Sequence, residues 1–313
     1  MRTFLVASLA MLVAGDGLAQ LSTDRDAETD IRGDRQRLGP DSPPEPGPPS
    51  SPGFEIALTA PILFTDNAVG ATGTTAGSGR RADGHFNPDL LLKWSRQFAA
   101  LKLSASIDAS VDRFFTETDQ DEDTFFGGVT ASFTDGRSDL FVPYLSYNVT
   151  ADLRPDFGNT DDVLHSFSAG FVSAIAFRPG GGRITLREAT RPGDRSLALD
   201  VSAGRRLADP RDFENTFTVA TLDLSYVAAS DWTFGLTPKL RVRWYDNFEG
   251  EFRRDYRLSG ILRAAWTPAW LTRIVPAAEI DFTLSFLKNF SNLPRERFSQ
   301  WEGGPALALA WRF

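Results

Sequence analysis

The sequence predicts an all-β fold, namely a transmembrane antiparallel up-and-down β-barrel of about twelve strands, with fourteen strands as the alternative. From residue 53 onward, apolar and polar residues alternate with the period of two that is typical of strands, and helical spacing is sustained nowhere. No continuous apolar run reaches the ~18 residues of a membrane-spanning helix. In a membrane barrel only every second residue faces lipid, so the mean hydropathy of −0.22 is compatible with this fold.

The first 52 residues divide into two segments that precede the strands. Residues 1–19 begin with Met1-Arg2, continue as an apolar run and end with small residues, which predicts a secretory signal peptide. Residues 20–52 are rich in charge and then in proline, which predicts a disordered periplasmic leader. The barrel is expected to occupy residues 53–313. The chain has no cysteine and a net charge of −8, which excludes thiol chemistry and argues against nucleic-acid binding.

Twelve strand segments follow from the alternation, and each is long enough to cross a bilayer, which takes about 9–11 residues of a tilted strand. They are residues 54–65, 86–96, 99–112, 124–134, 138–150, 163–177, 195–205, 216–228, 232–245, 254–266, 274–287 and 301–313. Because proline removes a hydrogen-bond donor from the ladder, we expect local bulges where proline interrupts a segment. These positions are Pro61, Pro88, Pro143, Pro238 and Pro276.

The connections between these segments alternate in length, and short turns on one rim with longer loops on the other are typical of outer-membrane barrels. The connection 178–194 departs from this alternation, and residues 184–186 are a candidate for a further strand. One added strand would give an odd total and place the two termini on opposite rims. Twelve strands are therefore favoured, with fourteen if a second strand has been missed.

The segment 232–245 shows the alternation most clearly. One face is uncharged and begins and ends with Trp232 and Trp244. A tilted strand between these two residues rises roughly 30 Å, near the ~25 Å of an apolar band with an aromatic girdle at each edge. We therefore predict that Trp232, Trp244 and Trp266 belong to a girdle at the lipid interface. The other face carries several cations and should point into the lumen.

The predicted inward charges are distributed unevenly around the barrel. A basic wall consists of Lys239, Arg241, Arg243, Arg257 and Arg263, and inward acidic residues are Asp108, Asp112, Glu279 and Asp281. A basic wall that faces an acidic one sets up a transverse field across a wet lumen, which orients dipolar or anionic solutes. The arrangement resembles that of small monomeric channels whose arginine tracks pass acidic sugars.

The C-terminal residues alternate between an apolar face and a face of small or charged residues. The apolar face carries Leu307, Leu309, Trp311 and the final Phe313. This ending resembles the C-terminal assembly signal of Gram-negative outer-membrane β-barrels. The resemblance implies delivery to the barrel-assembly machinery, a place in the outer-membrane lipid and periplasmic N- and C-termini.

The sequence therefore predicts a passive diffusion channel for small hydrophilic, anionic solutes, with no cofactor and no bound metal. An occluded barrel with a structural or surface-interaction role is the first alternative, because twelve strands lie between the filled interior of eight-stranded barrels and the channel of sixteen-stranded ones. A barrel hydrolase, lipase or protease, is the second alternative. It would use one of the two histidines, His85 beside Asp83 or His165. The identity of the solute, the oligomeric state and the role of the leader stay open.

Overall fold

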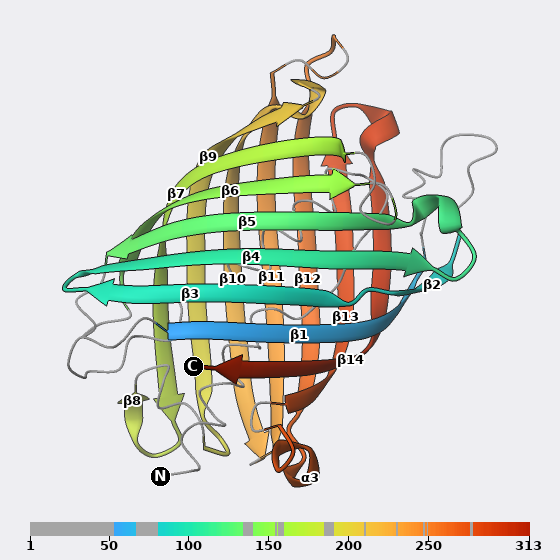
Figure 1. Cartoon of the computed structure of the whole chain (residues 1–313). Coiled ribbons are helices and arrows are strands. Elements are labelled where there is room, and N and C mark those ends of the chain that lie inside the picture. Colours follow the sequence, from blue (N-terminus) through green and yellow to red (C-terminus); the bar gives the residue numbers. More distant parts are fainter. Residues whose placement is uncertain are drawn as a thin grey trace.

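The computed structural model describes residues 53–66, 81–133, 140–153, 155, 160–184, 191–209, 211–229, 231–246, 248, 250–275 and 278–313. The predicted signal peptide, the leader and Pro276 lie outside these residues. Figure 1 shows a sheet that curls round until its first and last strands meet. The strands are β1 (Gly53–Thr65), β2 (Asp83–Phe86), β3 (Asp89–Phe98), β4 (Leu101–Phe114), β5 (Glu122–Phe133), β6 (Val142–Leu153), β7 (Thr160–Arg178), β8 (Gly182–Ile184), β9 (Arg195–Asp209), β10 (Asn215–Ala229), β11 (Trp232–Tyr245), β12 (Arg254–Trp266), β13 (Ala278–Ser291) and β14 (Phe298–Arg312).

The barrel closes because β14 pairs antiparallel with β1, and every other neighbouring pair in the wall is also antiparallel. The last residue takes part in the closure, since Phe313 N donates to Phe54 O at 2.9 Å and Phe54 N donates to Phe313 O at 3.2 Å. β2 and β3 both lie between β1 and β4, so they form one interrupted strand. With β8 only a short addition to β7, the described wall is a closed twelve-stranded barrel, as the sequence predicts.

The interruption between β2 and β3 coincides with prolines on two adjacent strands. Asn87 and Pro88 separate the two short strands, and Asn87 N donates to Pro61 O of β1 at 3.2 Å. The predicted local irregularity is confirmed at this pair of prolines. The prediction of a bulge is wrong at Pro143, which keeps its register with β7. It is also wrong at Pro238 where β11 meets β12, because Pro238 pairs in register with Gly260.

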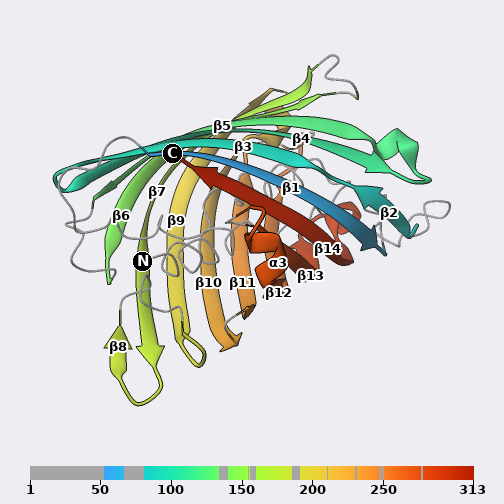
Figure 2. The same ribbon diagram turned by 60° about the horizontal axis from the view of Figure 1, so that its bottom comes forward.

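β8 lies near the candidate strand at residues 184–186, but it does not cross the wall. It spans Gly182–Ile184 and pairs with the end of β7, opposite Ala176 to Arg178. Figure 2 shows β7 and β8 extending beyond the ends of the neighbouring strands. The long connection 178–194 is therefore a hairpin added to β7.

Side chains alternate between an inner and an outer face in every strand of the wall. The outer face exposes large apolar residues from all twelve strands, for example Phe64, Leu90, Ile107, Val129, Leu145, Phe167, Leu207, Tyr226, Leu240, Leu262, Leu284 and Leu307. A continuous apolar surface of this kind is an aggregation hazard in water and the normal lipid-facing surface of a membrane barrel. The barrel is therefore built to span a membrane with its strands. No helix of the described residues is long and apolar enough to do so.

The two rims differ in which connections they carry. We call the rim with Gly53 and Phe313 the terminal rim and the opposite one the loop rim. The terminal rim carries residues 99–100, 134–141, 179–194, 230–231 and 267–277, and the loop rim carries residues 66–82, 115–121, 154–159, 210–214, 246–253 and 292–297. The predicted contrast in length is wrong for the connection 267–277, which contains the short helix α3 (Ala269–Thr272) and is longer than several loops of the other rim.

Candidate functional site: the charged inner wall

The predicted basic residues of β11 and β12 all lie on the inner face. The four arginines Arg241, Arg243, Arg257 and Arg263 are 2–7% exposed. Lys239 alternates in step with Arg241 along β11. The inner face is therefore charged and nearly inaccessible, which indicates that side chains fill most of the bore.

Three of these cations form a cluster that we call the cationic triad, Lys239, Arg241 and Arg257. Arg241 and Arg257 are directly opposite partners across the β11–β12 ladder, and Lys239 lies two residues before Arg241. The charges of both arginines act on the Lys239 ammonium. Like charges placed opposite each other in a sheet destabilise the pairing. The three cations therefore lie close together on the inner face, where each also makes further polar or electrostatic contacts.

Arg243 belongs to a different group, which lies at the loop rim. Its Nη1 donates to Tyr245 Oη at 3.0 Å, and its register partner on β12 is Asp255. The Asp255 carboxylate also accepts from Arg253 at 2.7 Å. The Arg253 guanidinium is 4.4 Å from the Tyr245 ring centroid and 4.3 Å from that of Phe248. Arg243 thus extends a network that anchors the loop 246–253.

Arg263 adds no excess positive charge to the basic wall, because its guanidinium is paired with carboxylates. Arg263 Nη2 lies 2.6 Å from Glu279 Oε1 and 2.7 Å from Asp281 Oδ1, and all three side chains are buried. The sequence analysis placed the two carboxylates on the next strand but did not pair them with the arginine. Because β12 and β13 are neighbours and the register brings the three groups together, Arg263 forms ion pairs with both carboxylates.

The remaining predicted acidic residues lie across the lumen from the triad. Asp108 and Asp112 face inward on β4, and β4 is six places from β11 in the ring of twelve strands. The predicted basic residues of β11 and the predicted carboxylates of β4 therefore lie on opposite sides of the ring, and their role in lining a pore stays a prediction. Asp108 is 6% exposed and has further polar or electrostatic contacts within the wall.

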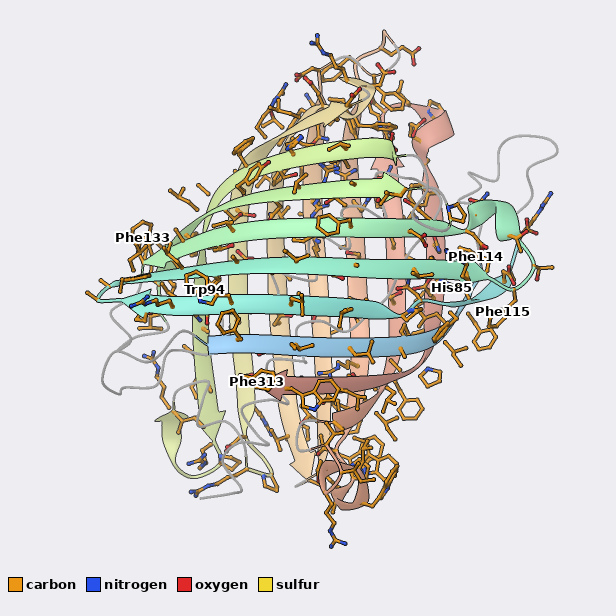
Figure 3. The ribbon with its side chains drawn as sticks, viewed as in Figure 1. His85, Trp94, Phe114, Phe115, Phe133 and Phe313 are labelled. Carbon is orange, nitrogen blue, oxygen red and sulfur yellow. The ribbon has the colours of Figure 1, made fainter. Side chains whose placement is uncertain are left out.

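Asp112 is part of a cluster around His85 that the sequence did not predict. His85 Nδ1 lies 2.6 Å from Asp112 Oδ1, and His85 Nε2 lies 3.1 Å from Glu302 Oε2. The imidazole is 0% exposed and stacks on Phe114 with ring centroids 4.7 Å apart. Figure 3 shows His85 and Phe114 at the end of the barrel nearest the loop after β4. We call His85, Asp112 and Glu302 the histidine clamp, since it joins β2, β4 and β14.

The interpretation of Asp83 as the partner of His85 is wrong. The Asp83 carboxylate accepts hydrogen bonds from the backbone N–H groups of Gly84, Thr116 and Glu117 at 2.7–2.9 Å. It therefore fixes the loop after β4 and is not available to orient the imidazole.

The two histidines lie in different surroundings. The His85 imidazole is enclosed between the carboxylates of Asp112 and Glu302. His165 alternates with the outward Phe167, and its Nδ1 lies 2.8 Å from Tyr147 Oη. Within the residues that the structure describes, no group of three or more His, Asp or Glu side chains is arranged to hold a metal ion.

Sequence reasoning missed Glu302 and Arg253, the two groups that complete the clamp and the loop anchor. Glu302 has the same parity as the small inward residues Ala306 and Ala308, so the alternation of the last strand was the signal that could have found it. Arg253 lies just outside the predicted strand 254–266, where periodicity gives no signal.

The predicted assembly signal and aromatic girdle lie on the outer face. Trp311 is 38% exposed and Phe313 is 75% exposed, whereas Ala308 and Ala310 are buried inside. Leu307 and Leu309 share the parity of Trp311. The rings of Trp232 and Trp266 stack at the terminal rim with centroids 5.8 Å apart, and Trp244 occupies the loop-rim end of the same face of β11. The roles of these residues in assembly and at the interface remain predictions.

Comparison with known proteins finds similarity in solved barrels. No protein-family model and no curated protein matches the sequence. The translocator domain of the autotransporter NalP from Neisseria meningitidis is 12% identical with a TM-score of 0.45, covering 95% of this chain and 100% of that one. The KdgM porin in complex with disordered oligogalacturonate is 8% identical with a TM-score of 0.41, covering 82% and 99%. LpxR from Salmonella typhimurium is 11% identical with a TM-score of 0.38, covering 82% and 99%.

Proposed function

We propose that this protein is a narrow passive channel for small anionic solutes in the outer membrane of a Gram-negative bacterium. The observation that carries the proposal is the cationic triad, in which Arg241 and Arg257 are direct cross-strand partners and Lys239 is beside them. An anion that passes or binds beside such a cluster offsets the repulsion between its cations.

A carboxylate of β4 faces the triad across the lumen. Asp108 lies six strands away around the ring, whereas Asp112 is held by His85 in the histidine clamp. The electric field between the triad and Asp108 is directed across the lumen. Because Arg263 forms ion pairs with Glu279 and Asp281, the proposal rests on Lys239, Arg241 and Arg257. The low exposure of the inner wall favours small solutes over large ones.

The proposal places both termini in the periplasm and the loop rim outside the cell. The C-terminal residues Leu307, Leu309, Trp311 and Phe313 would then be read by the barrel-assembly machinery, and outer-membrane lipid would contact the outer face. The even number of strands supports the placement of both ends on one side.

An occluded structural barrel is the second candidate, and the buried ion-pair networks favour it. The histidine clamp and the Arg253–Asp255 pair lie near the loop rim, and Arg263 with its two carboxylates lies toward the terminal rim. Such networks hold inner side chains in place, which is also what a plugged barrel requires.

Solute flux separates the two candidates. Liposomes containing the refolded chain are placed in solutions of glucose or of glucuronate, two probes of similar size that differ in charge, and swelling is measured. The channel proposal predicts faster entry of glucuronate, and it predicts that the triple variant Lys239→Gln/Arg241→Gln/Arg257→Gln loses this preference. Arg183→Gln, an exposed change at the terminal rim, is the control. Folded protein that admits neither sugar would favour the occluded barrel.

A further inference from the structure

Some basic residues near the loop rim are neutralised by carboxylates. Arg113 lies 2.8 Å from Asp123, and Arg205 forms ion pairs with Asp246 and Glu214. The Arg205 guanidinium holds the pKa of the Asp246 carboxyl, which lies in the connection after β11, below its ordinary value. These cations therefore present little net charge to a ligand.

Two cations on neighbouring strands are not neutralised in this way, Arg254 on β12 and Lys288 on β13. Neither forms an ion pair with a carboxylate anywhere in the described part of the chain. The Arg254 guanidinium carbon lies 5.5 Å from the ring centroid of Phe252, and the Lys288 ammonium lies 4.8 Å from that of Phe290. Aromatic faces attract cations without neutralising them. Neither cation is therefore compensated by a carboxylate of the described residues.

The two cations lie on adjacent strands and flank one aromatic pair. Lys288 is the register partner of Leu258, and the next outward residues toward the loop rim, Phe290 and Tyr256, are partners of each other. Arg254 follows at the end of β12, four residues from Leu258, which is ~13 Å along a strand. The Lys288 side chain leans along this path, because its ammonium lies over Phe290.

Lys288 lies within the apolar outer surface, with exposed Phe290 and Tyr256 on its loop-rim side. The outward residues just below it, Phe286 and Trp301, are in ring contact at 4.6 Å and continue the apolar face. A lysine in this position extends its ammonium toward the headgroup region while its stem stays in contact with apolar surface. An ammonium that reaches the headgroup region in this way can contact lipid phosphates.

The position of Arg254 is fixed by the side chain of Asn292. Asn292 Oδ1 accepts from Arg254 N at 2.6 Å, and Asn292 Nδ2 donates to Phe252 O at 2.8 Å. The backbone that carries the cation is thus held before a ligand arrives, which lowers the entropic cost of binding.

We propose that Arg254, Tyr256, Lys288 and Phe290 bind the phosphate of an anionic lipid in the leaflet at the loop rim. The guanidinium fork matches two phosphate oxygens, the ammonium adds a point charge from the adjacent strand, and the aromatic pair packs between them. Other outward cations that lie over rings, Arg96 over Phe98 and Arg195 over Tyr226, are on separate strands near the terminal rim. The proposal needs only a barrel in a membrane, so it stands whether or not the channel proposal holds.

Lipid binding to the full chain tests this site. The protein is purified in mild detergent, and bound phosphatidylglycerol and phosphatidylcholine with identical acyl chains are compared by native mass spectrometry. The wild-type protein is expected to prefer phosphatidylglycerol. Each neutralised cation should weaken that preference about fivefold, and Arg254→Gln/Lys288→Gln about 25-fold.

Arg96→Gln/Arg195→Gln is the matched control, because it removes two outward cations that also lie over rings but at separate places. The control should keep the wild-type preference. Heat-modified gel migration confirms that each variant is folded. The proposal is overturned if the wild-type protein binds the two lipids equally, if Arg254→Gln/Lys288→Gln keeps its preference, or if the control loses as much.

Discussion

Replacing His85 by alanine removes the group that lies between two buried carboxylates. The side chains of Asp112 and Glu302 are 1% and 0% exposed, and each is within hydrogen-bond distance of the imidazole. Removing one partner of a buried ion pair typically destabilises a protein by about 3–5 kcal/mol. The stacked contact with Phe114 contributes about 0.5–1.5 kcal/mol more. We therefore expect His85→Ala to lower the free energy of unfolding by about 4–6 kcal/mol, on the combined estimates for buried pairs and stacked rings.

Urea titration in phospholipid vesicles, followed by tryptophan fluorescence, measures this loss. His165→Ala is the matched control, because it removes one hydrogen bond to Tyr147 on the outer face and should cost only about 1 kcal/mol. The triple variant His85→Ala/Asp112→Asn/Glu302→Gln should be more stable than His85→Ala alone, because it also removes the two buried charges. The reasoning fails if His85→Ala lowers the free energy of unfolding no more than His165→Ala does. It also fails if the triple variant is no more stable than His85→Ala alone.

Three further substitutions test other parts of the wall. Arg263→Met leaves the two carboxylates of β13 without their shared cation and should cost about 3–5 kcal/mol in the same titration. Gly304→Ala places a Cβ against the backbone of β1 and should lower the refolding yield, whereas Gly260→Ala, with open space around its Cβ position, should leave it unchanged. Deleting Phe313 removes two backbone hydrogen bonds to Phe54, about 1–3 kcal/mol in vitro. In cells we expect a much larger loss of heat-modifiable barrel from membrane fractions, and an unchanged amount would contradict the assembly signal.

The wall of the barrel could be predicted because period-two alternation depends only on residues close in sequence. Each of the twelve predicted segments overlaps a strand of the wall, and the parity of residues 232–245 placed Trp232 outward and Arg241 inward. The position of β4 opposite β11 also follows from counting strands, since consecutive strands are neighbours in an up-and-down barrel.

The pairing of charges could not be predicted, because it depends on register and on closure. Glu302 meets His85 across 217 residues of sequence only because β14 closes on β1. The break at Asn87–Pro88 hid β2, so His85 was assigned to a loop. Arg263 and Glu279 lie on adjacent predicted strands, but alternation does not specify which residues face each other across the ladder.

The sign of ion selectivity tests the proposed channel most directly. The refolded chain is inserted into a planar bilayer under a salt gradient, and the reversal potential of single-channel currents is recorded. A channel governed by Lys239, Arg241 and Arg257 gives discrete current steps with a reversal potential that indicates anion preference. Cation preference would contradict the role of the triad, and a folded barrel without conductance would contradict the channel itself.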